Sequence, residues 1–219
     1  EEEYLSAREA SAISLQRSII GNSWQDEEEV ELNFNPIFHY VAGILFPQDH
    51  SGYHEGSQIE LDNGVDLDPE TEIIATLGSK EGLANLAMAI TAPGDVMLVP
   101  NPSYPIHPYG FMIAGGTLRH LPTLHNGVFN PEEYMKSLSR AVSHSVPKPV
   151  AVVVSFPSNP TAQLCDLEFY NELIKFAKKN ELWVLSDLAY AEIYFEENPP
   201  PSILQIKNAK DVAVEFTSL

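Results

Sequence analysis

The stretch Leu182-Trp183-Val184-Leu185-Ser186-Asp187-Leu188-Ala189-Tyr190 begins as an apolar run and ends in polar residues. An earlier run, Ala151–Phe156, has the same form and leads into Ser158-Asn159-Pro160-Thr161. Strands buried on both faces of a sheet are nearly continuous apolar runs, and α/β sheets bind ligands at the carboxyl ends of their strands. The two stretches therefore predict parallel strands with a ligand site at their carboxyl edge.

The rest of the chain from Val65 onward alternates strand-like and helix-like segments. This alternation predicts an α/β fold with three layers, α/β/α, in which helices cover both faces of a mainly parallel sheet. Asn130 followed by Pro131 is a typical helix start, with an N-cap and a proline at the first helical position. The expected strands are 73–77, 96–99, 117–121, 151–156, 182–185 and 212–216, and the expected helices are 78–90, 106–114, 131–140 and 167–179.

Charge divides the chain unevenly. The formal net charge of 219 residues is −19, and residues 1–72 hold 17 acidic but only 2 basic side chains. This excess argues against nucleic acid or an anionic membrane as a partner. We interpret residues 1–64 as an acidic N-terminal segment without an assigned fold, and residues 65–219 as the α/β domain.

Three features of the sequence bear on the compartment and on membrane insertion. Cys165 is the only cysteine, so an intramolecular disulfide is impossible and a reducing compartment is expected. No apolar run approaches the roughly 20 residues that a membrane-spanning helix needs. The start of the chain also lacks the basic and apolar regions of a signal peptide. These features favour a cytoplasmic protein.

Three polar residues suit an aromatic ligand that carries a ring nitrogen and a phenolic oxygen. Asp187 ends a buried strand, where a carboxylate is costly unless it is paired, and a pyridinium N–H is a suitable partner. Tyr190 follows three residues later, and Asn159 is available from the other strand to share a phenolic oxygen. The alternative is that Asp187 is a helix N-cap or part of an internal ion pair.

Two further stretches could complete such a site. Gly78-Ser79-Lys80 lies at a strand-to-helix junction, where amide N–H groups and the helix dipole attract an anion. Tyr104 lies in the rigid loop Asn101-Pro102-Ser103-Tyr104-Pro105, where its ring could stack on a flat ligand. An ordinary helix start and a packing tyrosine are the alternatives.

Other site classes find little support in the sequence. The phosphate-binding Gly-x-x-x-x-Gly-Lys-Ser/Thr and Gly-x-Gly-x-x-Gly patterns are missing, as is the hydrolase pattern Gly-x-Ser-x-Gly. His50 and His54 are four residues apart but lack the His-Glu-x-x-His spacing, so we expect no metal site. His107 is compatible with a place near the pocket or with simple packing.

Taken together, these segments resemble the class I/II aminotransferases of fold type I, which depend on pyridoxal 5′-phosphate (PLP), and specifically the alanine and LL-diaminopimelate type. The matching pieces cover about the last two-thirds of the chain in the order and spacing of the family. They run from Val65–Glu70 and Thr76–Leu83 through Asp95–His107, Ser155–Gln163 and Ser186–Tyr194 to Asp211–Leu219.

The resemblance implies a role for each matching residue. Ser79 and Lys80 would bind the cofactor phosphate through their backbone amides, and Tyr104 would stack on the ring. Asn159 and Tyr190 would bond the phenolic oxygen, and Asp187 would pair with the ring nitrogen. Ser218 matches a phosphate-binding serine three positions before the lysine that binds the cofactor covalently.

The resemblance also implies what this sequence does not contain. The lysine would fall two residues past Leu219, so we expect no catalytic residue in this chain and an inactive partial large domain. The parent reaction would transfer an amino group between an amino acid and a 2-oxo acid, in a homodimer. A PLP-dependent lyase or synthase on the same scaffold and a non-catalytic association module remain as alternatives.

Overall fold

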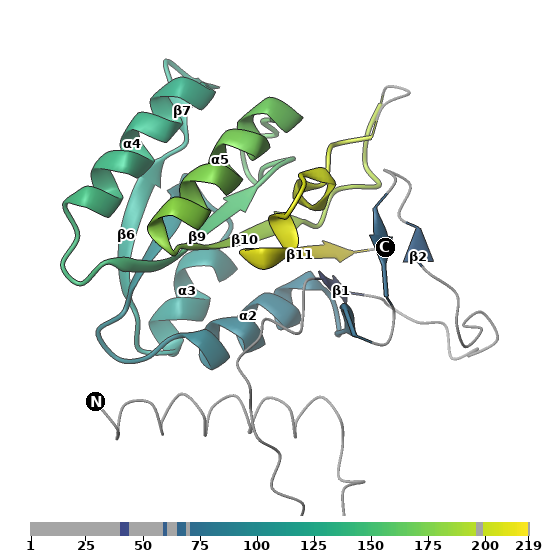
Figure 1. The fold of residues 1–219 in the computed structure, drawn as a ribbon, viewed down its shortest axis with the longest axis horizontal. Helices are drawn as coiled ribbons and strands as arrows, with labels where there is room; N and C mark the ends of the chain where they lie inside the picture. The colour runs from purple at the N-terminus through teal and green to yellow at the C-terminus, as the bar shows by residue number, and fades with distance from the viewer. Residues whose placement is uncertain (1–39, 44–58, 61–64, 69–70, 196–198, 219) are drawn as a thin grey trace, which may run out of the picture.

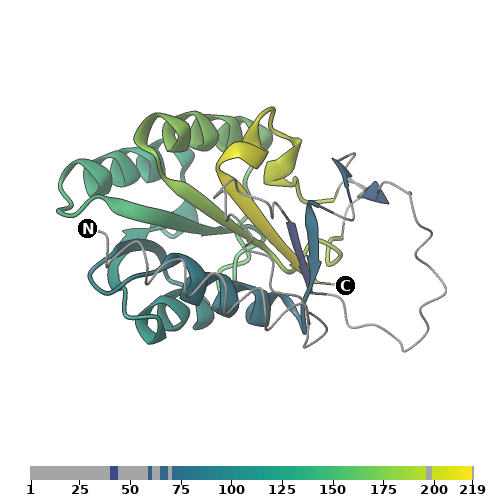
Figure 2. The same ribbon diagram turned by 60° about the horizontal axis from the view of Figure 1, so that its bottom comes forward.

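The computed structural model describes residues 40–43, 59–60, 65–68, 71–195 and 199–218. Its main feature is a single large sheet between two layers of helices (Figure 1; Figure 2). One layer holds α2 (Ser79–Ile90) and α3 (Ile106–Ile113), and the other holds α4 (Pro131–Ser143) and α5 (Leu167–Asn180). The chain therefore has the three-layer α/β/α architecture that its sequence pattern predicts.

The central sheet consists of strands that all run parallel to their neighbours. They are β1 (Tyr40–Gly43), β4 (Ile73–Ala75), β5 (Val96–Asn101), β6 (Thr117–Pro122), β9 (Pro149–Ser155), β10 (Trp183–Leu188) and β11 (Ala213–Ser218). Their order across the sheet is β4-β1-β11-β10-β9-β5-β6. Two small antiparallel pairs lie outside it: β2 (Ile59–Glu60) with β3 (Asp66–Leu67), and β7 (Leu124–His125) with β8 (Val128–Phe129).

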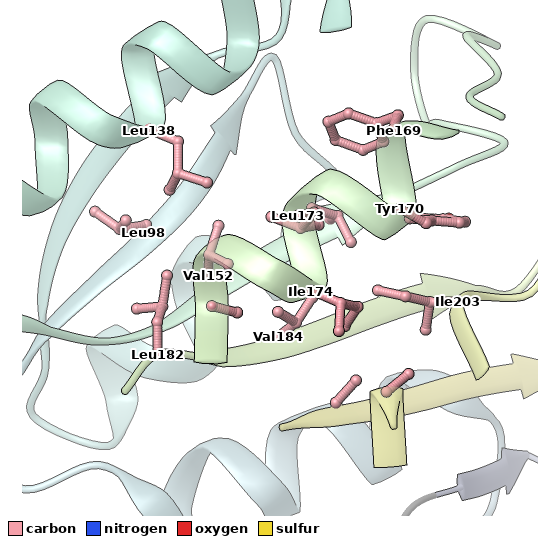
Figure 3. Close-up of a cluster of buried hydrophobic side chains, with 14 of the residues drawn as sticks. Leu98, Leu138, Val152, Phe169, Tyr170, Leu173, Ile174, Leu182, Val184 and Ile203 are labelled. Atoms are coloured by element: carbon pink, nitrogen blue, oxygen red, sulfur yellow. The ribbon is translucent and has the colours of Figure 1, made fainter. Parts of the chain in front are cut away.

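Both faces of the sheet are buried, as expected for parallel strands. Leu98 of β5 belongs to a core cluster on the side of α4 and α5, whereas its neighbours Met97 and Val99 belong to a cluster on the side of α2 and α3. Figure 3 shows the first cluster, in which Leu173 and Ile174 of α5 pack onto the sheet. Continuous apolar runs such as Val152–Val154 are thus needed to fill both layers.

Capping side chains mark the starts of α4 and α5. The Asn130 side chain caps α4 by accepting a hydrogen bond from Glu133 N at 3.0 Å, and Pro131 is the first helical residue, as predicted. Asp166 caps α5 in the same way, accepting from Phe169 N at 2.8 Å. Two short 3₁₀ turns, η1 (Ile203–Gln205) and η2 (Ala209–Asp211), connect β10 to β11.

The sheet also includes a strand that the sequence did not reveal. β1 lies between β4 and β11 and pairs with both, although no strand was expected before residue 65. The short strand β2 likewise lies before residue 65. His50 and His54 lie outside the described residues, as does most of the acidic segment 1–64, whose separation from the α/β domain stays a prediction.

No helix in the part of the chain that the structure describes is both long and apolar enough to cross a bilayer.

Candidate functional site

The topology of the sheet selects one position for a ligand. β5 and β9 are neighbours in the sheet. The chain continues from β5 through α3 to β6 on one side, and from β9 through α5 to β10 on the other side. The two connections therefore run in opposite directions along the sheet and cover opposite faces of it. In open α/β sheets, ligands bind in the crevice at the carboxyl ends of the strands at such a switch point. A pocket is found there, and Pro100, Pro102, Ser155, Phe156 and Asn159 are part of its lining.

Asn159 and Tyr190 meet at this edge. The Asn159 side-chain amide donates a hydrogen bond to the Tyr190 hydroxyl at 2.8 Å, although the two residues are 31 positions apart. The turn that carries Asn159 is closed by Ser158, whose backbone N–H donates to the Gln163 carbonyl at 3.0 Å and whose hydroxyl accepts from the Gln163 N–H at 2.9 Å. A fixed loop therefore presents the Asn159 amide beside the phenol.

Asp187 is the second-last residue of β10, and it lies directly opposite Ser155 of the neighbouring strand β9. Its side chain is 9% exposed, and its Oδ2 lies 2.7 Å from Nε2 of His107, a completely buried residue at the start of α3. Because an ionised carboxylate only accepts hydrogen bonds, His107 must carry its proton on Nε2 to make this contact. Asp187 Oδ1 accepts from the Ala189 N–H at 3.3 Å, so the carboxylate is held from two sides.

Tyr104 and Lys80 lie next to His107, although neither lines the pocket described above. The Tyr104 ring packs edge-on against His107, with 6.1 Å between the ring centroids. The Lys80 ammonium lies 5.3 Å from the centroid of the Tyr104 ring, a cation–π contact, and the Tyr104 hydroxyl raises the pKa of Lys80 through a hydrogen bond. The resemblance gives the Lys80 backbone amide a place at the cofactor phosphate, and the structure places the Lys80 side chain over the Tyr104 ring.

Ser79 is the first residue of α2, next to Gly78, whose backbone has φ 86° and ψ 155°. Glycine adopts this conformation without strain, and no side chain of the described residues caps the helix. The first amides of α2 thus lack a side-chain partner and can bind an anion. Ser218 ends β11 in the backbone register opposite Gly43.

The structure brings most of the candidate residues to one edge. Asn159 contacts Tyr190, His107 joins Asp187 to Tyr104, and Lys80 lies over Tyr104. Sequence reasoning left His107 open between a site and packing. Its position three residues after Tyr104, in the first turn of a helix that follows a strand end, was the available signal. No group of three or more His, Cys, Asp or Glu side chains among the described residues could hold a metal ion.

The polar groups at this edge of the sheet fit PLP. Asp187 is an almost buried carboxylate with no lysine or arginine partner in the described residues, which suits a protonated ring nitrogen. The Asn159 amide and the Tyr190 hydroxyl offer hydrogen bonds to a phenolic oxygen, and the uncapped α2 start suits a phosphate. The arrangement can therefore hold a flat, anionic, nitrogen-containing ring by both ends.

Comparison with known proteins gives a consistent result. The family model "Aminotransferase class I and II" matches residues 53–218. AatC of Rhizobium meliloti (strain 1021) is 58% identical over 156 residues, which are 71% of this chain and 37% of that protein. The glutamate-pyruvate aminotransferase AlaC of Escherichia coli (strain K12) is 50% identical over 155 residues, 71% of this chain and 36% of AlaC.

A solved structure agrees with these relatives. Substrate-bound BacF from Bacillus subtilis superimposes with a TM-score of 0.59 at 32% identity, and the match covers 69% of this chain and 37% of BacF. The chain thus spans somewhat more than a third of the length of the relatives it matches. With the family model matching most of its residues, the chain belongs to the class I and II aminotransferases, a family of PLP-dependent enzymes.

Proposed function

We propose that this chain is part of the large domain of an aminotransferase that moves an amino group between an amino acid and a 2-oxo acid, in a biosynthetic process. The main support for the proposal is that two side-chain contacts, Asp187 with His107 and Asn159 with Tyr190, both lie at the carboxyl edge of the sheet. The residues come from three separate segments, and chance packing rarely brings a buried carboxylate and an amide–phenol pair to the same strand ends.

Each residue has a definite task in this proposal. Bound PLP supplies an electron-accepting ring, and Asp187 keeps the ring nitrogen protonated so that the ring can accept electrons. His107 holds the Asp187 carboxylate in place through Nε2. Asn159 and Tyr190 bind the phenolic oxygen, Tyr104 covers one ring face, and Ser79, Lys80 and Ser218 bind the phosphate.

Two alternatives use the same residues differently. A PLP-dependent lyase or synthase would keep all of the cofactor contacts, because these contacts do not fix the reaction outcome. A non-catalytic association module would keep the fold without turnover. The coding sequence after Leu219 separates these classes. A Ser-Lys continuation and an arginine-bearing C-terminal domain would support the enzyme.

Binding of PLP to the 219-residue chain is expected to be non-covalent and without transamination. The resemblance places the covalently binding lysine beyond Leu219, and the Lys80 ammonium is held over the Tyr104 ring. Equilibrium dialysis measures the binding, and borohydride reduction followed by peptide mass spectrometry tests for a covalent link. A reducible adduct on one specific lysine would contradict the expectation.

We further propose a cytoplasmic homodimer that associates through the layer of α2 and α3. This layer exposes several large apolar side chains, and clustered apolar surface commonly marks an interface. The exposed side chains are Leu77, Met88, Tyr109, Met112 and Ile113, with Ile113 at 79% exposure.

A charge on this layer is expected to weaken self-association at least several-fold. Ile113→Lys places an ammonium in the proposed interface, whereas Val146→Lys makes the same charge change at a side chain that is 97% exposed in the loop between α4 and β9, outside the layer of α2 and α3. Light scattering after size exclusion reports the masses. A monomeric parent chain, or equal behaviour of the two variants, would rule out this interface.

A further inference from the structure

A second polar cluster lies in the core, on the face of β11 that is directed toward α5 and η1. Glu215 is fully buried there, and its Oε2 accepts hydrogen bonds from the Ser186 hydroxyl at 3.1 Å and from the Ile203 N–H at 3.0 Å. The Ser202 hydroxyl donates to Oε1 of the same carboxyl group. The proposed cofactor contacts use none of these side chains, so the proposed reaction leaves this buried carboxylate without a task.

The cluster ties together three elements that follow one another in the chain. Ser186 belongs to β10, Glu215 to β11, and Ser202 is the N-cap of η1. The Ser202 hydroxyl also accepts from the Leu204 N–H at 3.0 Å, and the Gln205 side chain accepts from the Ser202 N–H at 3.0 Å. The cap that starts η1 is therefore fastened to the sheet through one carboxyl group.

The charge of this carboxyl group has no counterion among the described residues. The titratable groups that interact with it electrostatically are the Tyr170 phenol and the Cys165 thiol. Burial raises the pKa of both, that of Cys165 to about 12, so both are neutral near pH 7. Burial also raises the pKa of Glu215 to about 7, against the three hydrogen bonds that favour its ionised form.

We propose that Glu215 is a positioning residue whose protonation fastens the η1 turn against β10 and β11. The neutral carboxyl group fits the buried cluster without an uncompensated charge, because a serine hydroxyl can rotate to accept its proton. The ionised form keeps its three donors but lacks a cation, and it gains solvation when the turn opens. Opening would loosen the segment that joins Ser186, next to Asp187, to the strand of Ser218.

The direction of the pH effect follows from the raised pKa. The closed form binds the proton more tightly than an exposed glutamate does, whose pKa is near 4.5. The stabilisation is therefore complete below about pH 4.5 and is lost as the pH rises through about 7. Only the consequence for the cofactor site depends on the proposed function; the proton site itself does not.

The direct test is a carbon-13 NMR titration of the Glu215 carboxyl in the whole chain. We expect a midpoint near 7 for this buried group. In parallel, the hydrogen-exchange protection factors of the Ile203 and Leu204 amides should fall on the order of 100-fold between pH 5 and pH 8. The Leu173 amide in α5 should keep its protection.

Two variants separate the proton site from a purely structural contact. Glu215→Gln keeps the size and a carbonyl acceptor but cannot ionise, so it should make the protection of Ile203 and Leu204 independent of pH. Glu172→Gln, the matched change on the surface, should leave the pH dependence unchanged. An ordinary midpoint for Glu215, or an unaltered pH dependence in Glu215→Gln, would overturn the proposal. PLP is not used, so failure of the aminotransferase assignment would not affect this result.

Discussion

Replacing Asp187 with alanine is expected to weaken PLP binding about 10- to 100-fold. The change removes a charged hydrogen bond to the ring nitrogen, and hydrogen bonds that involve charged groups contribute ~1.5–3 kcal/mol. Asp187 is almost buried and is held by His107 and the Ala189 N–H, so its carboxylate needs no reorganisation to bind the ring. Equilibrium dialysis of the variant and the parent chain measures the ratio.

The controls for this prediction address charge and folding. Asp187→Asn keeps the shape but removes the charge, so its affinity should fall between those of the parent and the alanine variant. Asp211→Asn removes a carboxylate whose side chain is 59% exposed and paired with Lys178 far from the site, and should leave PLP affinity unchanged. Circular dichroism checks that each variant is folded. Equal affinities for the parent chain and Asp187→Ala would remove Asp187 from the proposed site.

The central strands and their helices were predictable because their local signals agree. The runs 151–154 of β9 and 183–185 of β10 are apolar, as the covered part of such a strand must be, and the helix starts at Asn130 and Asp166 carry capping side chains. Parallel strand ends share one edge, which is why the sequence could bring Asn159 and Tyr190 together. These are consequences of periodicity and topology rather than of detailed packing.

Other features were not accessible because they depend on tertiary contacts. β1 has only four residues, and its place between β4 and β11 comes from pairing with strands more than 30 and 170 positions away. The contact of His107 with Asp187 spans 80 positions. The Lys80 side chain lies over Tyr104 only because α2 and the loop before α3 meet. A flexible side chain has no periodic signal, so sequence alone assigns it no direction.

An aromatic cluster supports the loop that presents Asn159. The Phe169 ring lies 5.1 Å from that of Phe129, 5.5 Å from that of Tyr134 and 5.7 Å from that of Phe156, measured between centroids. Phe156 leads directly into the Asn159 turn, and Gln163 at the end of that turn accepts a hydrogen bond from the Phe129 N–H at 2.7 Å. Loss of the cluster should therefore disturb both the core and the site.

Phe169→Ala is expected to lower the free energy of unfolding by about 3–5 kcal/mol, the range for removing a buried phenylalanine ring. Phe169 is 1% exposed and contacts four aromatic rings, so its truncation removes all four contacts and leaves a cavity in the core. Phe195→Ala makes the same chemical change at a ring that is 100% exposed and should alter stability by less than ~0.5 kcal/mol. Urea unfolding followed by tryptophan fluorescence gives both values. Similar losses in the two variants would show that the aromatic cluster does not stabilise this core, and a Phe169→Ala chain with unchanged PLP affinity would show that the Asn159 turn does not depend on it.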